Sequence, residues 1–364
     1  MSGSLSSKKK IIYITSSSKL KIKAISNVYA TTRNSNENLD DVIIIPIIQS
    51  TFELPEQPIN EYGIMSAKMR IDGCRAENLI GDDYIAIISI ESYIDENLGK
   101  EFVVSIGEYP DGTIIVANVK CESFHPALYS DYKNNHTTAV FGGYSSTFGS
   151  YMNANGHCDN PKDWFKLKPR VEYITEALMN ADNVGLDANT IYGYLDYFKD
   201  YPKDGVIFSS LSSLMSNQYN FKEFRRYLLK FCNNVIVEID YIIGLETRGI
   251  HIGMLMAHFF NCGFQMARKA GKLPYKNLLS TKYSTEYSKD SIELAPLKGL
   301  STAKNILIVD DLIATGGSIC AVSTCIRAFV KDSVNIYCYA PLKVPSLENS
   351  ARELIETKNK IIWL

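Results

Sequence analysis

Short apolar runs rich in β-branched residues alternate along the chain with stretches that have helical spacing. Three such runs in the first half predict buried strands, at 11–15, 41–48 and 84–92. The segment 100–120 has two apolar runs around Pro110-Asp111-Gly112, which predicts a β-hairpin. Helical spacing follows the first strand and returns at 171–181, where we expect a helix that closes this half.

The second half repeats the alternation after a polar stretch that ends at Thr190. We expect a helix-like stretch at 191–198 and a helix at 222–232. Strands are expected at 235–244, 305–311 and 334–342, with a helix at 317–330 between the last two. Strands that alternate with helices favour a mostly parallel sheet. We therefore expect two α/β domains, at 11–182 and 191–364, with a linker at 183–190 and a disordered leader at 1–10.

Composition narrows the class of protein. The chain of 364 residues is 46% apolar, which suffices for two ordinary globular cores. A net charge of −2 gives no reason to expect nucleic acid or an anionic membrane as a partner. Eight scattered cysteines and a polar N-terminus favour reduced thiols in a cytoplasmic protein. Five histidines, none at metal-ligand spacing, argue against a histidine-based metal site.

The stretch ILIVDDLIATGGS carries the clearest chemistry. Asp310 and Asp311 end a buried strand, and in a parallel sheet ligands gather at the carboxyl ends of strands. The loop Ala314–Ser318 consists of small residues before a helix, so its N–H groups are free to approach a phosphate. Hydroxyls of Thr315 and Ser318 add donors. Two carboxylates beside a phosphate site suit a sugar phosphate, with the acids accepting from ribose hydroxyls.

This stretch resembles the phosphoribosyl-pyrophosphate (PRPP) motif of type I phosphoribosyltransferases. Four further segments are similar to those of adenine phosphoribosyltransferases: YPKDGVIF, DYIIGLETRGIHIG, ARKAGKLP and YSTEYSKDSIEL, from Tyr201, Asp240, Ala267 and Tyr283. The resemblance implies a parallel sheet with a flexible hood loop and a homodimer. It also implies transfer of the phosphoribosyl group from PRPP to adenine with Mg²⁺, giving AMP and pyrophosphate.

The resemblance also implies roles for residues. Glu286 in the hood loop and Arg248 would be catalytic. PRPP would be bound by Asp310, Asp311, Ala314, Thr315, Gly316, Gly317, Ser318, Arg268, Lys269 and Lys272. Adenine would lie against Ile207, Phe208 and Ser209.

The chain departs from the family pattern beside the base and in the hood. Ser209-Ser210 stand where the family has a basic residue and Asp, and Asp204 replaces a proline. Ser288 replaces a glycine after Glu-Tyr, which stiffens the hood because glycine reaches positive φ at lower cost.

In the first half, the segment TSSSKLKIKAI leaves two interpretations open. It is typical of a phosphate site at a helix start and equally of a serine-capped helix. With LPEQPINEYGIMSAKMR and ISIESYID it resembles inosine/xanthosine triphosphatases, which use Mg²⁺ to hydrolyse purine triphosphates. The resemblance implies a mixed sheet and a nucleotide site of Ser16, Ser17, Ser18, Lys21, Glu91 and Arg70, with Glu91 as metal ligand.

Several family positions of that site have changed. Ser18 replaces an asparagine, Thr51 stands where a second acid is expected, and Tyr93 replaces a glycine near Glu91. Hydrolysis, nucleotide sensing and a structural, dimer-forming role therefore remain open for this half. For the whole chain we expect a purine salvage enzyme fused to an altered triphosphatase-like domain. The alternative is a PRPP- or nucleotide-sensing regulator without turnover.

Overall fold

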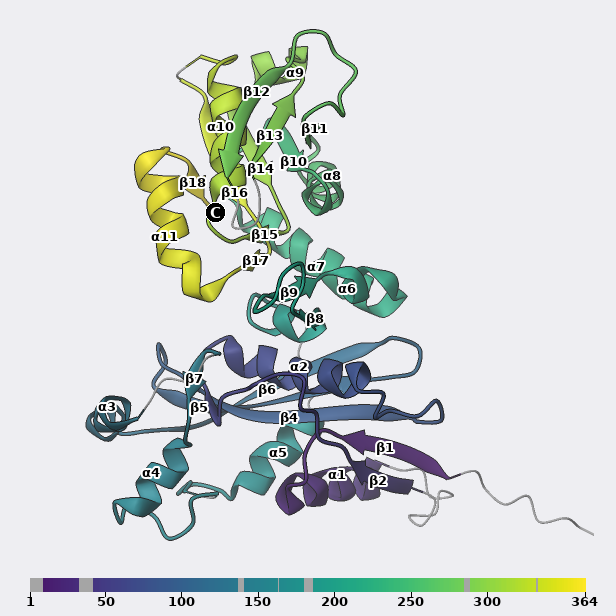
Figure 1. The fold of residues 1–364 in the computed structure, drawn as a ribbon, viewed down its shortest axis with the longest axis vertical. Helices are drawn as coiled ribbons and strands as arrows, with labels where there is room; N and C mark the ends of the chain where they lie inside the picture. The colour runs from purple at the N-terminus through teal and green to yellow at the C-terminus, as the bar shows by residue number, and fades with distance from the viewer. Residues whose placement is uncertain are drawn as a thin grey trace, which may run out of the picture. The chain divides into compact units, whose positions relative to one another are not determined.

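The protein has a mixed α/β fold that divides into two compact units, Met1–Phe224 and Arg225–Leu364 (Figure 1). The computed structural model describes residues 9–32, 42–136, 141–162, 164–179, 186–284, 289–331 and 333–364. Within these ranges, no helix is long and apolar enough to span a bilayer.

A five-stranded mixed sheet forms the centre of the first unit. Its strands, in spatial order, are β2 (Val42–Pro46), β1 (Lys10–Ile14), β4 (Ala86–Asp95), β5 (Lys100–Glu108) and β6 (Ile114–Ser123). The first three are parallel, and β4, β5 and β6 form an antiparallel meander. The strands and the hairpin expected from the apolar runs are confirmed, with ends shifted by a few residues.

Helices cover both faces of this sheet. α1 (Lys19–Thr32) and α5 (Arg170–Met179) pack on the face that presents Ile90 of β4. α2 (Tyr62–Ala76) packs on the opposite face, where Gly63 leaves room for the ring of Tyr93. A smaller aromatic cluster lies among α3 (Pro126–Asn135), α4 (Phe148–Ala154) and β7 (Gly143–Tyr144), which pairs with β3 (Gln57–Pro58). The sequence analysis did not predict α2, α3 or α4.

The last segment of the first unit differs from its prediction. The expected helix at 191–198 is a 3-10 helix, η3 (Thr190–Tyr194), followed by β8 (Asp196–Lys199). The stretch is thus helical only in its first part, where Gly193 packs so closely on the sheet that a Cβ would lie 2.7 Å from Val116 Cγ2. The compact units divide after Phe224, so the expected linker at 183–190 falls within the first unit.

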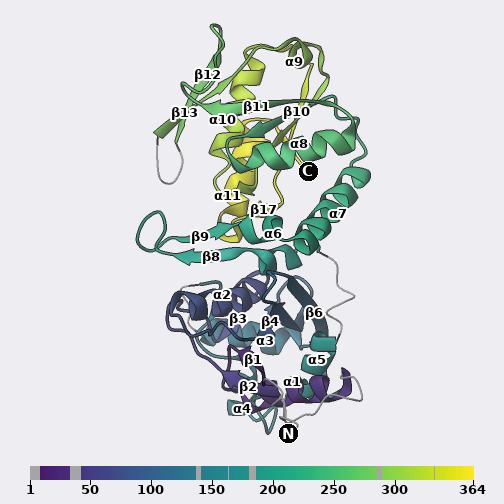
Figure 2. The same cartoon turned by 90° about the vertical axis from the view of Figure 1, so that its right-hand side faces the viewer.

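A hairpin and two helices complete this unit. β8 pairs antiparallel with β9 (Ile207–Ser210), and the two strands lie side by side in Figure 2. α6 (Ser212–Ser216) and the start of α7 (Gln218–Asn234) follow. The buried Asn220 fixes them to the β5–β6 turn, because its side-chain oxygen accepts from the N–H of Ile114 at 3.0 Å.

The second unit is built on a seven-stranded sheet. Its strands, in spatial order, are β12 (Leu279–Ser284), β13 (Lys289–Leu294), β11 (Gly263–Lys269), β10 (Tyr241–Leu245), β14 (Asn305–Val309), β16 (Asn335–Tyr339) and β18 (Ile362–Trp363). The five strands from β11 to β18 are parallel, and β12–β13 is an antiparallel hairpin at one edge. A short parallel pair, β15 (Leu312–Ile313) and β17 (Leu342–Lys343), lies beyond the strand ends.

Two long helices lie on opposite faces of this sheet. α8 (Arg248–Phe260) faces Ile242 and Gly244 of β10, which lie near Gly253 of the helix. α10 (Gly317–Arg327) packs with the alternate residue Ile243. The shorter α9 (Lys298–Thr302) and α11 (Glu348–Arg352) complete the unit, and α11 continues as a π-helix, η5 (Glu353–Lys358). The carboxyl ends of β10 and β14 therefore lead directly into α8 and the loop before α10.

Candidate active site

The adjacent aspartates lie at the carboxyl end of β14, one of the central strands of the second unit. The N–H of Asp310 donates to the carbonyl of Tyr339 at the end of β16, at 3.1 Å. The N–H of Asp311 donates to Oδ1 of Asp310 at 2.9 Å. These bonds fix the backbone of the pair, so both carboxylates lie at the edge where parallel-sheet proteins bind ligands.

One cation approaches this pair. Nε of Arg248 lies 2.8 Å from Oδ2 of Asp311, whose side chain is 9% exposed. Burial, together with the neighbouring charge of Asp311, raises the pKa of Asp310 well above its ordinary value. The raised pKa means that a charge on Asp310 opposes its burial, so added donors or cations would stabilise the ionised pair.

The loop Ala314–Ser318 leads into α10 as expected. Gly316 caps the helix with a φ of 82°, and a Cβ there would lie 2.9 Å from Ile355. Glycine is therefore required both by the backbone angle and by the packing. The N–H groups of the first turn of α10 are available for an anion, because an α-helix leaves its first four N–H groups without partners inside the helix.

Gly249 brings the start of α8 against the end of β14. A Cβ at this position would lie 2.5 Å from the carbonyl oxygen of Val309 and 2.8 Å from Cα of Asp310. Real Cβ atoms do not approach backbone so closely, so only glycine fits. This contact is what places Arg248 beside Asp311.

A second group of cations surrounds Glu246, in the turn between β10 and α8. Nζ of Lys272 lies 2.5 Å from Oε1 of Glu246, and Nε of Arg268 lies 3.3 Å from Oε2. The backbone N–H of Lys269 also donates to Oε2, at 2.9 Å. Burial alone would raise the pKa of Glu246, but the bonds from Lys272, Lys269 and Arg268 lower it to about 2. One carboxylate thus gathers the cationic side chains of Arg268 and Lys272 and the backbone of Lys269.

The expected base-binding residues Ile207, Phe208 and Ser209 lie on β9. This strand belongs to the first compact unit, whereas the aspartate pair belongs to the second. All three residues are half-buried, and the ring of Phe208 lies edge-on to that of Tyr201, with centroids 5.1 Å apart. Glu286, the expected acid/base, and Ser288 in the same loop lie outside the described residues.

The residues expected to form a nucleotide site in the first unit do converge in part. Nε of Arg70 on α2 lies 2.6 Å from Oε2 of Glu91 on β4. Nζ of Lys21 on α1 lies 3.8 Å from Oε1 of Glu91 and donates to the carbonyl of Ile90 at 2.5 Å. Ser16, Ser17 and Ser18 precede α1, where the N–H of Ser18 donates to Oγ of Ser16 at 3.2 Å.

The electrostatics of this group suit an anion better than a metal. Burial would raise the pKa of Glu91, but Arg70 and Lys21 lower it. Burial also lowers the pKa of Lys21, an effect that Glu91 opposes. Over the described ranges, no three His, Cys, Asp or Glu side chains form a group that could hold a metal ion. Glu91 is occupied by two cations, so the residues present do not fit the expected Mg²⁺ ligation there.

Two positions that departed from the triphosphatase pattern have structural roles. Tyr93 is 3% exposed, its ring is stacked on Phe102, and its hydroxyl accepts from the side-chain nitrogen of Asn118 at 2.7 Å. Thr51 donates through its N–H and hydroxyl to Glu77, at 2.6 and 2.8 Å. Both side chains thus contribute to packing and loop structure.

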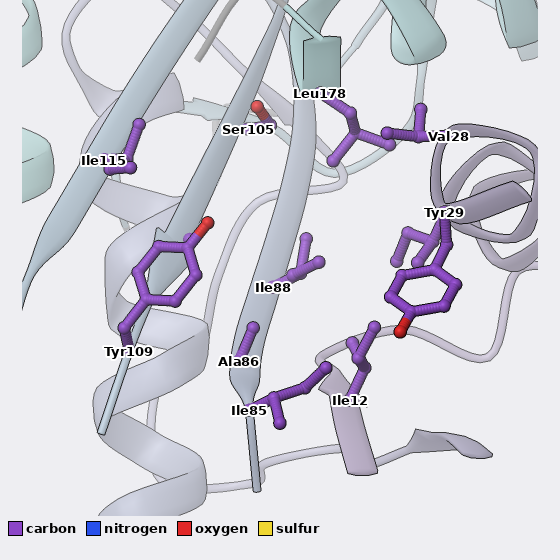
Figure 3. A pocket seen from close by; sticks show the side chains of 12 residues that line it. Ile12, Val28, Tyr29, Ile85, Ala86, Ile88, Ser105, Tyr109, Ile115 and Leu178 are labelled. Atoms are coloured by element: carbon purple, nitrogen blue, oxygen red, sulfur yellow. The ribbon is translucent and has the colours of Figure 1, made fainter. Parts of the chain in front are cut away.

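An apolar cavity of about 340 Å³ lies elsewhere in the first unit, between α1 and the sheet (Figure 3). Val28 and Tyr29 of α1, Ile88 of β4 and Tyr109 line it. The residues that line it are apolar apart from Ser105, Tyr29 and Tyr109, and none of them carries a charge.

The sequence analysis missed Glu246 and Gly249 as site residues. Both stand inside the segment GLETRG that carried the family resemblance, so their place in the motif was a usable signal. Their roles depend on contacts with β11 and β14, which spacing along the chain does not reveal.

Comparisons with known proteins concern mainly the later part of the chain. The phosphoribosyl transferase domain model matches residues 210–358. The adenine phosphoribosyltransferase of Brachyspira hyodysenteriae is 42% identical over 127 residues, covering 34% of this chain and 71% of the relative. The adenine phosphoribosyltransferase of Helicobacter pylori strain G27 is 36% identical over 168 residues, covering 46% of this chain and 89% of the relative. A solved adenine phosphoribosyltransferase from Saccharomyces cerevisiae is 27% identical with a TM-score of 0.42, covering 49% of this chain and 96% of that one.

Proposed function

The chain belongs to the adenine phosphoribosyltransferase family, and on this premise we propose that it converts adenine and PRPP to AMP and pyrophosphate. The bond from ribose C1 to the pyrophosphate oxygen breaks, and pyrophosphate leaves with the electron pair. A bond from C1 to N9 of adenine forms, and adenine gives up its imidazole N–H proton to a base, the role that the family resemblance implies for Glu286. The observation that carries the proposal is the aspartate pair at the end of β14, beside Arg248 and before the glycine loop of α10.

Each part of PRPP has a matching group in the second unit. Asp310 and Asp311 accept from the ribose hydroxyls. The N–H groups of Ala314–Ser318 and the start of α10 bind the 5-phosphate. Arg248, Arg268 and Lys272 stabilise the charge that develops on the departing pyrophosphate. Arg268 and Lys272 form ion pairs with Glu246 in the structure.

Mg²⁺ fits this site as a companion of PRPP. The carboxylates of Asp310 and Asp311 are the hard oxygen ligands that Mg²⁺ prefers. Asp310 and Asp311 would hold the ion together with PRPP. The ion would supply further charge neutralisation for pyrophosphate. A homodimer in the cytoplasm belongs to the same proposal, on the resemblance to the family.

The experiment that tests the proposal mixes the purified protein with Mg²⁺, PRPP and one of adenine, hypoxanthine or guanine. We expect AMP from adenine and no nucleotide from the other two bases. Binding of PRPP without product from any base would contradict the proposal and support a regulatory protein.

Lys272→Met tests the leaving-group cations. We expect PRPP binding to weaken about tenfold, since one charge-assisted contact to pyrophosphate is lost. Isothermal titration calorimetry measures the change. Lys276→Met is the matched control, because Lys276 is an exposed lysine in the same segment. Equal affinities of the two variants would contradict the assignment of Lys272.

For the first unit we propose binding of a purine nucleoside triphosphate at Lys21 and Arg70. The convergence of these two cations on Glu91 at the start of α1 supports it. We propose binding of the nucleotide without hydrolysis, because the carboxylate of Glu91 is paired with Lys21 and Arg70 and does not suit a metal ion. The resemblance to inosine/xanthosine triphosphatases suggests ITP and XTP as the nucleotides to test.

Lys21→Ala tests this second site. We expect the affinity for ITP to fall about tenfold or more, because the ammonium group contributes a charge-assisted contact to phosphate. Lys23→Ala, an exposed lysine on the same helix, is the control. Absence of ITP and XTP binding by the wild type, or the same loss in both variants, would contradict the proposed site. Hydrolysis with Mg²⁺ or Mn²⁺ would instead favour an active triphosphatase.

A further inference from the structure

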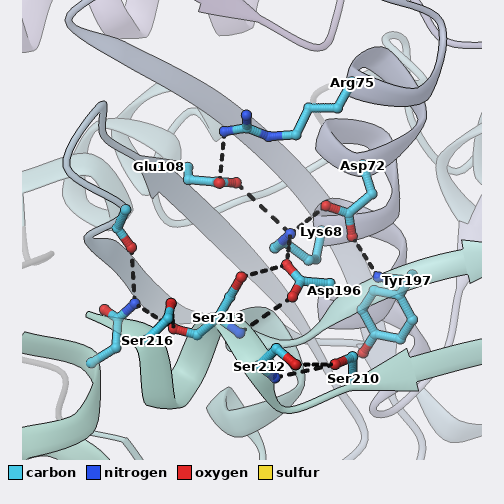
Figure 4. Close-up of polar contacts among 12 residues, drawn as sticks. Lys68, Asp72, Arg75, Glu108, Asp196, Tyr197, Ser210, Ser212, Ser213 and Ser216 are labelled. Atoms are coloured by element: carbon cyan, nitrogen blue, oxygen red, sulfur yellow. Dashed lines mark hydrogen bonds and ion pairs between the residues drawn. The ribbon is translucent and has the colours of Figure 1, made fainter.

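A buried lysine links α2 to the hairpin that carries the proposed base-binding strand. Lys68 is 0% exposed, and its ammonium group forms a hydrogen-bonded ion pair with Asp72 one turn along α2. Its Nζ also lies 3.8 Å from Oε2 of Glu108 on β5 and 3.6 Å from Oδ1 of Asp196 on β8 (Figure 4). All of these residues belong to the first compact unit.

The charges explain why the lysine is tolerated inside the unit. Burial alone would lower the pKa of Lys68, but Asp72, Glu108 and Asp196 together raise it. Arg75 shares the excess negative charge, because its Nη2 lies 2.7 Å from Oε1 of Glu108. A buried cation that contacts carboxylates on three different elements fixes their relative positions, since moving one of them leaves a charge unpaired.

Two of these carboxylates fix the strand β8. Oδ2 of Asp72 accepts from the backbone N–H of Tyr197 at 2.8 Å. Oδ1 of Asp196 contacts Lys68 and also accepts from the hydroxyl of Ser213, at 2.7 Å. β8 is therefore held to α2 through one side chain and one backbone group.

β9 depends directly on β8. In the hairpin, Asp196 pairs with Ser210 and Tyr197 pairs with Ser209. The two residues of β8 that α2 holds are thus directly opposite the end of the strand that carries Ile207, Phe208 and Ser209. A slip of one residue would turn every side chain of β9 to the other face.

We propose that Lys68 and Asp72 are positioning residues for adenine, holding β8 so that β9 presents its backbone and Phe208 to the base. The inference rests on the proposed function of β9. It gives the first unit a role in the transferase reaction that is separate from any nucleotide site of its own. Loss of the contact should impair binding of the base and leave binding of PRPP intact, because the PRPP residues lie in the second unit.

The test uses the full chain and two variants, Lys68→Met and Asp196→Asn. Asp196→Asn keeps the shape of the side chain and removes its charge, so it decides the question if Lys68→Met does not fold. Lys133→Met is the matched control, since Lys133 pairs with Glu96 on the surface of the same unit, at 2.8 Å. The readouts are KM for adenine, KM for PRPP, and amide hydrogen exchange of the peptide spanning residues 196–210.

For Asp196→Asn we expect KM for adenine to rise about tenfold while KM for PRPP changes less than roughly twofold. Amide exchange in β8 and β9 should become faster, and Lys133→Met should match the wild type in all three readouts. Equal rises in both KM values, or unchanged KM and unchanged exchange, would overturn the inference. If the wild type makes no AMP, the proposed function fails, and the exchange measurement decides separately whether Lys68 holds the hairpin.

Discussion

Asp310→Asn combined with Asp311→Asn is expected to weaken PRPP binding at least about 100-fold, because two charge-assisted contacts to ribose hydroxyls are lost. The fold should survive. The raised pKa of Asp310 means that its charge opposes burial, so a neutral residue of the same shape relieves repulsion. Arg248 loses its ion pair with Asp311, but its side chain is 33% exposed and can be solvated. Calorimetry with PRPP and thermal unfolding measure the two effects.

The chain contains a matched control for this double change. Asp82 and Asp83 are also adjacent, and both are exposed in the first unit. Their replacement by asparagine changes the net charge equally and should leave PRPP affinity unchanged. Unaltered affinity in the 310/311 variant would show that the pair does not bind PRPP. A fall in affinity accompanied by unfolding would show that the carboxylates are needed for the fold instead.

Gly249→Ala is expected to destabilise the second unit by about 1–3 kcal/mol, the typical cost of forcing an extra methyl group into close packing. Its Cβ would meet backbone atoms of Val309 and Asp310 at 2.5 and 2.8 Å, which cannot move without displacing the end of β14. The melting temperature should fall by roughly 5 °C. PRPP binding should weaken as well, because the same displacement disturbs the ion pair of Arg248 with Asp311.

Gly253→Ala separates this clash from the general effect of alanine on a helix. Gly253 lies one turn further along α8, so the gain in helix propensity is similar at both positions. Its Cβ would meet Phe264 at 3.1 Å and Cα of Gly244 at 3.3 Å, a milder approach that includes a movable side chain. If both variants lose the same stability, the close approach of Gly249 to β14 is not the reason why glycine stands there.

Much of the second unit was predictable from sequence because its signals are local. The apolar run before Asp310 fixed β14, and the glycine loop fixed the start of α10. The strand expected at 235–244 begins only at Tyr241. The apolar residues before Tyr241 alternate as in a strand, but pairing with β14 starts at Tyr241, and the alternation alone does not indicate that point. Glu246 gave no sequence signal of its own, because its contacts with Arg268 and Lys272 form only in the folded chain.

The first unit was less predictable because its defining contacts are distant in sequence. Lys68 and Asp72, four residues apart, have the spacing of a solvated surface pair, and the sequence contains no sign that Asp196 would bury them. The prediction of a helix at 191–198 was inaccurate for the same reason. Its apolar residues have helical spacing, but the side chains of Ile191 and Tyr194 are buried on a sheet formed by residues about 80 positions earlier.

The most direct test of the account follows AMP and pyrophosphate together in one reaction of the wild-type protein with adenine, PRPP and Mg²⁺. The account predicts that one pyrophosphate appears for each AMP, and that both products vanish when Asp310 and Asp311 are replaced by asparagine. Pyrophosphate released without AMP, or no turnover despite tight PRPP binding, would contradict the central claim that this chain is an adenine phosphoribosyltransferase.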